Sequence, residues 1–125
     1  MILINDVLSL HQYSIDKYGG ANGIRDEGGL KSAIARPFQT FDGSDLNATI
    51  FEKVAALGES LIINHSFIDG NLRTGFLAMA TLLIDNGLML IATQEDAYDF
   101  IIKVSTGELR FDGMVIWLKE NTDFI

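Results

Sequence analysis

The sequence contains no cysteine, and this absence excludes disulfide bonds, cysteine-ligated zinc sites and catalysis by a thiolate. Proline is almost as rare, with a single residue at Pro37. Basic residues are also few: nine Lys and Arg stand against 17 Asp and Glu, which gives a formal net charge of −8. A chain of this sign repels nucleic acid, so we expect no DNA or RNA partner. A nucleotide needs only a local positive site and is not excluded.

Long apolar runs are absent too. The longest candidate, Phe76 to Ile84, is too short to cross a membrane and is followed by an Asp-Asn-Gly sequence. The first residues lack the basic flank and the cleavage region of a signal peptide. We therefore expect no membrane partner and a cytoplasmic location.

What the chain does have is enough apolar sequence for one helical core. Its 125 residues suit a single domain spanning 1–125, and 48% of them are hydrophobic. Apolar residues recur at helical spacing in several segments. The pattern predicts an all-α protein, a compact bundle of six or seven helices with a short flap or hairpin. The expected helices cover residues 6–17, 29–36, 49–64, 72–86, 93–104 and 112–120, and the third of them begins at either Asn47 or Thr49.

The most informative stretch runs from residue 65 to residue 75 and reads His-Ser-Phe-Ile-Asp-Gly-Asn-Leu-Arg-Thr-Gly. Gly70 permits a tight turn, and Asn71 is the predicted N-cap of the helix that follows. A helix N-terminus offers unpaired N–H groups and the positive end of the helix dipole, which together bind anions. The first turn contains Leu72 and Arg73. The sequence therefore predicts a phosphate site formed by residues 70–73.

Three side chains of this stretch suggest chemistry. Arg73 is a cation in a first helical turn, where only an arriving anion makes it favourable, and its planar fork suits phosphate oxygens. Asp69 offers the hard oxygen ligand that Mg²⁺ takes alongside phosphates. His65 can accept a proton from a hydroxyl group. Each residue alone also has an ordinary explanation as a cap, a turn or a solvated side chain, so the argument rests on their combination.

Several structural expectations surround this stretch. Phe67 should anchor it in the core, and the helix from Phe76 to Ile84, apolar on nearly every side, should lie at the centre of the bundle. His11 lies at the edge of the first helix, where a structural or exposed role is favoured over a catalytic one. The segment from Phe38 to Ser44 is expected to form an extended flap or small hairpin; the alternative is an ordinary surface loop.

Caps and connectors near the C-terminus are also predicted. Thr93 and Asp96 have the spacing of a capping box, and Asp112 is expected to cap the last helix. Residues 90–92 form either a short strand or a connector.

The central stretch resembles the motif of the Fic/Doc family, His-x-Phe-x-Asp/Glu-Gly/Ala-Asn-x-Arg. The matching positions are His65, Phe67, Asp69, Gly70, Asn71 and Arg73. Residues 30–37 resemble the segment that precedes the target-binding flap of the family, and the Asn-Gly pair at 86–87 and the short chain resemble its Doc branch. The resemblance covers roughly residues 5–120 and implies a Fic-like fold.

The resemblance also implies an activity. Fic/Doc proteins use ATP and Mg²⁺ to transfer part of the nucleotide to a Ser, Thr or Tyr hydroxyl of a protein. His65 would be the catalytic base, Arg73 would neutralise charge during transfer, and Asp69 would hold the metal. A flap corresponding to Phe38, Gln39, Thr40 and Phe41 would hold the target peptide by strand addition. Doc-like members are toxins paired with an antitoxin, and the Doc branch modifies a translation factor.

One known restraint of the family is missing. Some Fic relatives carry an inhibitory helix with Ser or Thr followed four residues later by Glu, and this spacing does not occur here. We therefore expect restraint by a separate antitoxin.

Leu72 departs from the family pattern. AMP-transferring relatives have Gly there, and Doc-type phosphotransferases usually have Lys. A Leu side chain should crowd the nucleotide pose that transfers AMP, so phosphate transfer is favoured. The alternatives are an AMP-transferring Fic enzyme, a degenerate member that binds a nucleotide or a partner with little catalysis, and a plain scaffold bundle.

Overall fold

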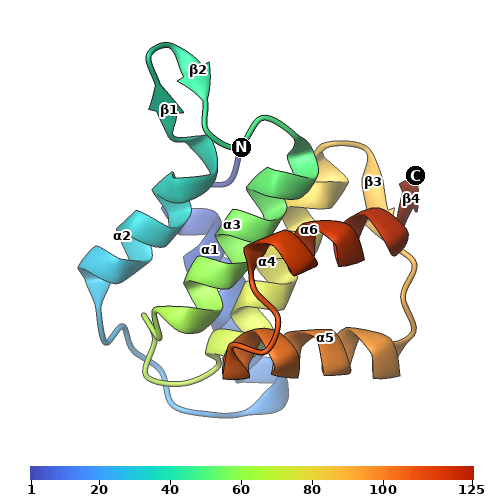
Figure 1. Ribbon diagram of the computed structural model, residues 1–125. Coiled ribbons are helices and arrows are strands. Elements are labelled where there is room, and N and C mark those ends of the chain that lie inside the picture. Colours follow the sequence, from blue (N-terminus) through green and yellow to red (C-terminus); the bar gives the residue numbers. More distant parts are fainter.

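The computed structural model describes residues 1–125 and contains six α-helices, one 3-10 helix and four short strands (Figure 1). The expected all-α bundle with a short hairpin is confirmed. In chain order the elements are α1 (Ile4–Tyr18), α2 (Glu27–Ala35), η1 (Arg36–Phe38), β1 (Thr40–Phe41), β2 (Ser44–Asp45), α3 (Ile50–Ile63), α4 (Asn71–Asp85), β3 (Leu88–Leu90), α5 (Gln94–Thr106), α6 (Phe111–Glu120) and β4 (Thr122–Phe124).

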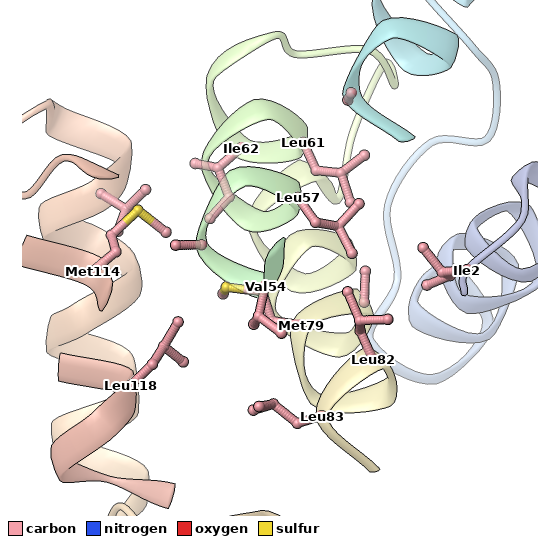
Figure 2. Packing of buried hydrophobic residues seen from close by; sticks show 14 of the residues in the cluster. Ile2, Val54, Leu57, Leu61, Ile62, Met79, Leu82, Leu83, Met114 and Leu118 are labelled. Atoms are coloured by element: carbon pink, nitrogen blue, oxygen red, sulfur yellow. The ribbon is translucent and has the colours of Figure 1, made fainter. Parts of the chain in front are cut away.

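The central pair of helices is α3 and α4, with α1 and α2 on one side and α5 and α6 on the other (Figure 1). The core lies between these layers, as Figure 2 shows for side chains of α3, α4 and α6 and for Ile2 at the N-terminus. The buried members labelled there are Ile2, Val54, Leu57, Leu61, Ile62, Met79, Leu82, Leu83, Met114 and Leu118. The predicted central position of the apolar helix α4 is confirmed, although Ile84 on one of its faces is exposed.

Two glycines let α3 and α4 approach each other closely. A Cβ atom on Gly58 of α3 would lie 2.1 Å from the sulfur of Met79, which is buried in α4. A Cβ atom on Gly75 of α4 would lie 2.7 Å from Cγ1 of Ile62 in α3. The position of the segment that joins these two helices therefore depends on residues without side chains on both of them.

The helix ends agree with the sequence in some places and differ in others. Thr49 and Glu52 form a reciprocal capping box at the start of α3. At α5 the Thr93 hydroxyl accepts the N–H of Asp96, which is half of the predicted box. The prediction that Asp112 caps the last helix is wrong: Arg110 is the N-cap, α6 begins at Phe111, and Asp112 lies in the first turn.

The strands form two small antiparallel ladders. In the hairpin, Thr40 pairs with Asp45 and Phe41 with Ser44, and the connecting Asp42 and Gly43 both have positive φ, of 51° and 80°. Two left-handed residues are what a two-residue hairpin turn requires, and Asp-Gly is a preferred pair for it.

The second ladder joins β3 to β4, with Leu88 opposite Phe124 and Leu90 opposite Thr122. Of the two alternatives for residues 90–92, a short strand or a connector, the structure has a strand, which lies two residues earlier at 88–90. The pattern did not predict β4. No helix in the structure combines the length and the apolar character needed to cross a membrane.

Candidate active site

The stretch singled out in the sequence forms the loop at residues 64–70, which joins α3 to α4 at one end of the central pair (Figure 1). We call it the catalytic loop, after the role that the sequence predicts for it. Phe67 anchors it: the side chain is only 2% exposed, and its ring stacks on the ring of His11 with centroids 3.8 Å apart and planes 6° from parallel. The predicted core position of Phe67 is confirmed, and His11 is buried against it.

His65 is exposed and has a φ of 48°, one of two positive values among the non-glycine residues. A left-handed backbone at a residue of this kind costs on the order of 1–3 kcal/mol and is often found at functional sites. The imidazole makes no hydrogen bond to other parts of the chain. The loop thus holds a strained residue whose ring is free to accept a proton.

Asp69 is exposed but held by the main chain. One carboxylate oxygen accepts the N–H of Ala21 at 3.1 Å, and the other accepts the N–H of Gly70 at 2.8 Å. These two bonds lower the pKa of the Asp69 carboxyl, and the charges of Arg73 and His11 lower it further. The carboxylate is therefore ionised at neutral pH, as a metal ligand must be.

Gly20 provides the space for this carboxylate. Its φ is 120°, and a Cβ atom there would lie 2.5 Å from Oδ2 of Asp69. Both the conformation and the contact require glycine at this position.

The start of α4 differs from the prediction by one residue. Gly70, with a φ of 77°, is the N-cap, and Asn71 is the first helical residue. The Asn71 side chain is turned back to Phe67, accepting its N–H at 3.0 Å and donating to its carbonyl at 2.9 Å. Asn71 therefore closes the loop rather than capping the helix. No side chain caps α4, so its first N–H groups stay available for an anion.

Arg73 reaches across to the C-terminal end of α1. Its Nε donates to the hydroxyl of buried Ser14 at 2.8 Å, and one terminal nitrogen donates to the carbonyl of Gly19 at 2.8 Å. Its guanidinium also lies over the ring of Tyr18, 5.7 Å from the centroid. A cation is favourable at a helix C-terminus, so the neighbouring helix supplies part of the reason for Arg73. Two of its five N–H groups are used in these bonds, which leaves others for phosphate oxygens.

Leu72 lies at one end of an apolar groove between α4 and α5, with a volume of about 830 Å³. We call it the α4–α5 groove. Its lining includes Phe76, Ile84, Met89, Tyr98 and Ile101, and Arg73 also borders it. The Leu72 side chain packs against the core from this groove. The structure turns this side chain toward the groove, and the predicted crowding of phosphates by Leu72 stays a prediction.

The hairpin lies at the opposite end of α3 from the catalytic loop (Figure 1). The 14 residues of α3 correspond to a helix roughly 20 Å long. Phe38 ends η1 and is half-buried against the core, Gln39 pairs with Leu46, and Phe41 is 74% exposed. A target segment bound at the hairpin would therefore lie far from His65.

The segment that does border the catalytic loop connects α1 to α2. Ile24 forms a β-bridge with Phe67, and the N–H of Ile68 donates to the carbonyl of Gly23 at 3.1 Å. Nothing in the helical periodicity of the sequence pointed to this pairing.

The donor set for a metal is small. No group of three or more His, Cys, Asp or Glu side chains could hold an ion. The ionised carboxylate of Asp69 lies beside an uncapped helix N-terminus. This pair suits a magnesium ion that arrives with nucleotide phosphates, because Mg²⁺ is usually bound by one or two carboxylates together with those phosphates. The residues present thus fit a magnesium–nucleotide complex.

Comparison with known proteins agrees with this geometry. The model of the Fic/DOC family matches residues 2–83, which include the whole catalytic loop and most of α4. The chain belongs to the Fic/DOC family. It is 38% identical over 99 residues to "Toxin Doc" of Mycolicibacterium smegmatis, an alignment that covers 78% of this chain and 76% of that protein. It is 29% identical over 104 residues to "Protein kinase doc" of Escherichia phage P1, covering 83% and 81%. These relatives make it a Doc-like member of the Fic/DOC family.

Sequence reasoning missed several residues that complete this Fic/DOC site. The one sequence signal for Ser14 is its spacing, because it lies three residues after His11 on the buried face of α1. In the sequence, Gly19 and Gly20 indicate the end of a helix and nothing about a site. Arg25, whose side chain donates to the carbonyl of His65, had no signal at all.

Proposed function

We propose that this chain is a Doc-like toxin that transfers phosphate from ATP to a Ser, Thr or Tyr hydroxyl of a target protein. The observation that carries the proposal is the catalytic loop itself: exposed, strained His65, ionised Asp69 and the uncapped start of α4 beside Arg73 lie in one short segment. The names of the two relatives, a toxin and a protein kinase, support the same activity.

In the proposed reaction His65 accepts the proton of the target hydroxyl. The hydroxyl oxygen bonds to the γ-phosphorus of ATP while the bond from that phosphorus to the bridging oxygen breaks, and ADP leaves. The N–H groups at the start of α4 and the free N–H groups of Arg73 stabilise the phosphate oxygens. Asp69 would hold magnesium, which supplies further neutralisation of phosphate charge. General-base catalysis of this kind contributes about 10²–10⁴-fold.

Transfer of AMP is the second candidate, favoured by the orientation of Leu72. The expected crowding of the AMP-transferring pose depends on a Leu72 side chain over the phosphates, whereas the side chain packs in the α4–α5 groove. A degenerate member that binds without catalysis is the third, since the Lys of Doc-type phosphotransferases is missing.

One experiment separates the three. The protein is incubated with magnesium, cell extract and ATP labelled at either the α- or the γ-phosphate, with His65→Ala as the control. Label from γ-ATP alone should appear on a protein and should be absent with the control. Label from α-ATP would instead establish AMP transfer. Label from neither, with binding of ATP intact, would establish the degenerate alternative.

We also propose that the antitoxin binds in the α4–α5 groove. The groove is apolar, opens beside Arg73, and is large enough for a few bulky side chains of an amphipathic segment. Because the inhibitory spacing of some Fic relatives does not occur in this chain, we expect a separate inhibitor. A partner in this groove would lie against the first turn of α4, next to the phosphate site.

A further inference from the structure

Arg25 ties the segment before α2 to the start of the catalytic loop. Its Nε donates to the carbonyl of His65 at 2.9 Å, and a terminal nitrogen donates to the carbonyl of Asn64 at 3.4 Å. The main-chain N–H groups of Arg25 and Asp26 both donate to the carbonyl of Ser66, at 2.7 and 3.0 Å. Three successive carbonyls of the loop are therefore bound by one short segment.

His11 holds the other end of the loop. Its Nε2 lies 2.8 Å from the main-chain carbonyl of Asp69. A carbonyl oxygen only accepts, so Nε2 carries the hydrogen and donates it. The ring is 5% exposed and cannot rotate freely, because it is stacked on the buried ring of Phe67.

The two bonds act on different reacting groups. A hydrogen bond to the carbonyl of His65 fixes the peptide plane next to the strained residue, and strain of this kind persists only where neighbouring contacts hold it. A hydrogen bond to the carbonyl of Asp69 fixes the peptide plane between Asp69 and Gly70. The Gly70 N–H of the same plane donates to the Asp69 carboxylate. We call these two hydrogen bonds clamps: the clamp from Arg25 fixes the main chain at His65, and the clamp from His11 fixes the Asp69 carboxylate.

We infer that Arg25 and His11 are positioning residues with separate tasks: Arg25 orients the His65 imidazole toward the target hydroxyl, and His11 sets the Asp69 carboxylate for magnesium. The inference rests on the proposed function for its kinetic consequences. Its geometric content, two independent clamps on one loop, does not.

The test uses Arg25→Gln, which removes the guanidinium fork, and His11→Phe, which keeps an aromatic ring on Phe67 but removes the donor. Misplacing a reacting group by about 1 Å can lower a rate by roughly 10²-fold. Arg25→Gln should therefore lower kcat at least about tenfold and leave the magnesium concentration for half-maximal rate unchanged. Loss of a residue that orients a metal ligand typically weakens metal affinity about 10–100-fold. His11→Phe should raise that magnesium concentration about tenfold and leave kcat at saturating magnesium within about threefold of the unmodified protein.

Three further variants separate positioning from general damage. Arg25→Lys keeps the charge but donates in fewer directions, so it should recover part of kcat. Arg110→Gln removes an exposed Arg that bonds Glu59 away from the loop, and Gln12→Ala removes an exposed hydrogen bond on α1. Both should behave like the unmodified protein in every measurement.

A second readout does not need activity. In NMR spectra of the free protein, Arg25→Gln should shift the His65 imidazole signals and leave the Gly70 amide in place, and His11→Phe should do the reverse. Calorimetric titration of Mg²⁺ into the ATP-bound protein should show weaker binding only for His11→Phe. Thermal unfolding shows whether each variant is folded.

These measurements distinguish two separate positioning residues from two merely structural residues. Parallel loss of kcat and magnesium affinity in both variants, or no change in either, would overturn the inference and leave two merely structural residues. If the unmodified protein transfers nothing and binds no magnesium–ATP, the proposed function fails. In that case the separate NMR shifts still support or overturn the two clamps.

Discussion

His65 shows the tension between stability and chemistry at the scale of one residue. A left-handed conformation is costly for any residue with a Cβ atom, yet the loop needs an imidazole at that point. Its carbonyl is bound by Arg25, whereas its ring is free. The main chain of His65 is therefore fixed by a hydrogen bond, whereas its imidazole stays free to contact another molecule. This arrangement is expected of a residue that contacts a substrate.

Replacing His65 should separate these two contributions. His65→Ala and His65→Gly should both lose the general base, with transfer reduced by about 10²–10⁴-fold. His65→Gly should unfold at a temperature equal to or above that of His65→Ala, because glycine adopts the left-handed backbone without steric cost. Label transfer and thermal unfolding of the two variants check this. A His65→Gly protein that retains full activity, or that is clearly less stable than His65→Ala, would contradict the assignment.

Asp69 should make stability depend on acidity. The hydrogen bonds from Ala21 and Gly70 lower the pKa of its carboxyl in the folded state below the usual value of an Asp in an unfolded chain. A lowered folded pKa means that the stabilisation is fully present above the unfolded pKa and is lost as the pH falls through the folded one. Thermal unfolding between pH 7 and pH 3, without metal, should therefore show a shallower acid loss for Asp69→Asn than for the unmodified protein. An identical loss of stability toward pH 3 in the two proteins would show that these hydrogen bonds do not favour the charged carboxylate.

At the scale of elements, the catalytic loop is positioned by the close packing of α3 against α4. The helices themselves were predictable, because apolar spacing, caps such as Thr49 and the motif at residues 65–73 are local signals. The reversed role of Asn71 was not, since its partner Phe67 lies across a turn whose conformation depends on the fold. Contacts from α1 and Arg25 were not predictable either, because they join residues 40 or more positions apart through a segment without periodicity.

Gly58→Ala tests the importance of that packing. Overpacking a core typically costs about 1–3 kcal/mol, against a gain in helix propensity of roughly 1 kcal/mol for replacing glycine. The new Cβ would lie 2.1 Å from the sulfur of buried Met79, so we expect a net loss of stability in chemical denaturation. Gly28→Ala is the matched control: it lies in α2 with its nearest neighbour 3.6 Å from a Cβ atom, and should be neutral or stabilising. Equal stability of the two variants would mean that Met79 moves aside without cost.

The prediction that the hairpin binds the target protein needs a direct test. If the hairpin holds a part of the target that is remote from the modified hydroxyl, Phe41→Ser should weaken modification, since its side chain is 74% exposed. ATP binding should be spared, because the hairpin lies at the opposite end of α3 from the loop. Phe38→Ser should instead lower stability, since Phe38 packs against the core. Phe124→Ser is the control, an 82% exposed aromatic on β4. Label transfer to extract proteins that is equal for Phe41→Ser and Phe124→Ser would remove the hairpin from target binding.

At the scale of the whole molecule, α4 links the catalytic loop to the α4–α5 groove. Its first turn carries the candidate phosphate site, and one of its faces forms a wall of the α4–α5 groove from Leu72 to Ile84. A helix described as apolar on nearly every side would normally be covered on every side. The open groove is therefore the surface on which we propose that the antitoxin binds, and its position next to Arg73 would give an inhibitor direct access to the site.

A charge placed in the α4–α5 groove should block the antitoxin without harming the toxin. Ile84→Glu changes a groove residue that is 56% exposed, so folding and label transfer should be unaffected, whereas antitoxin affinity should fall by at least about tenfold because a carboxylate would have to be buried without a partner. Ile116→Glu is the matched control, since Ile116 is 58% exposed on α6 and does not line the groove. Calorimetric titration of each variant with the product of the neighbouring small open reading frame measures the antitoxin affinity. Co-expression of the two proteins shows whether the antitoxin restores growth of the cells. Rescue should fail for Ile84→Glu and succeed for Ile116→Glu. Equal rescue of both variants would place the antitoxin on another face, and the apolar groove would then need a different occupant.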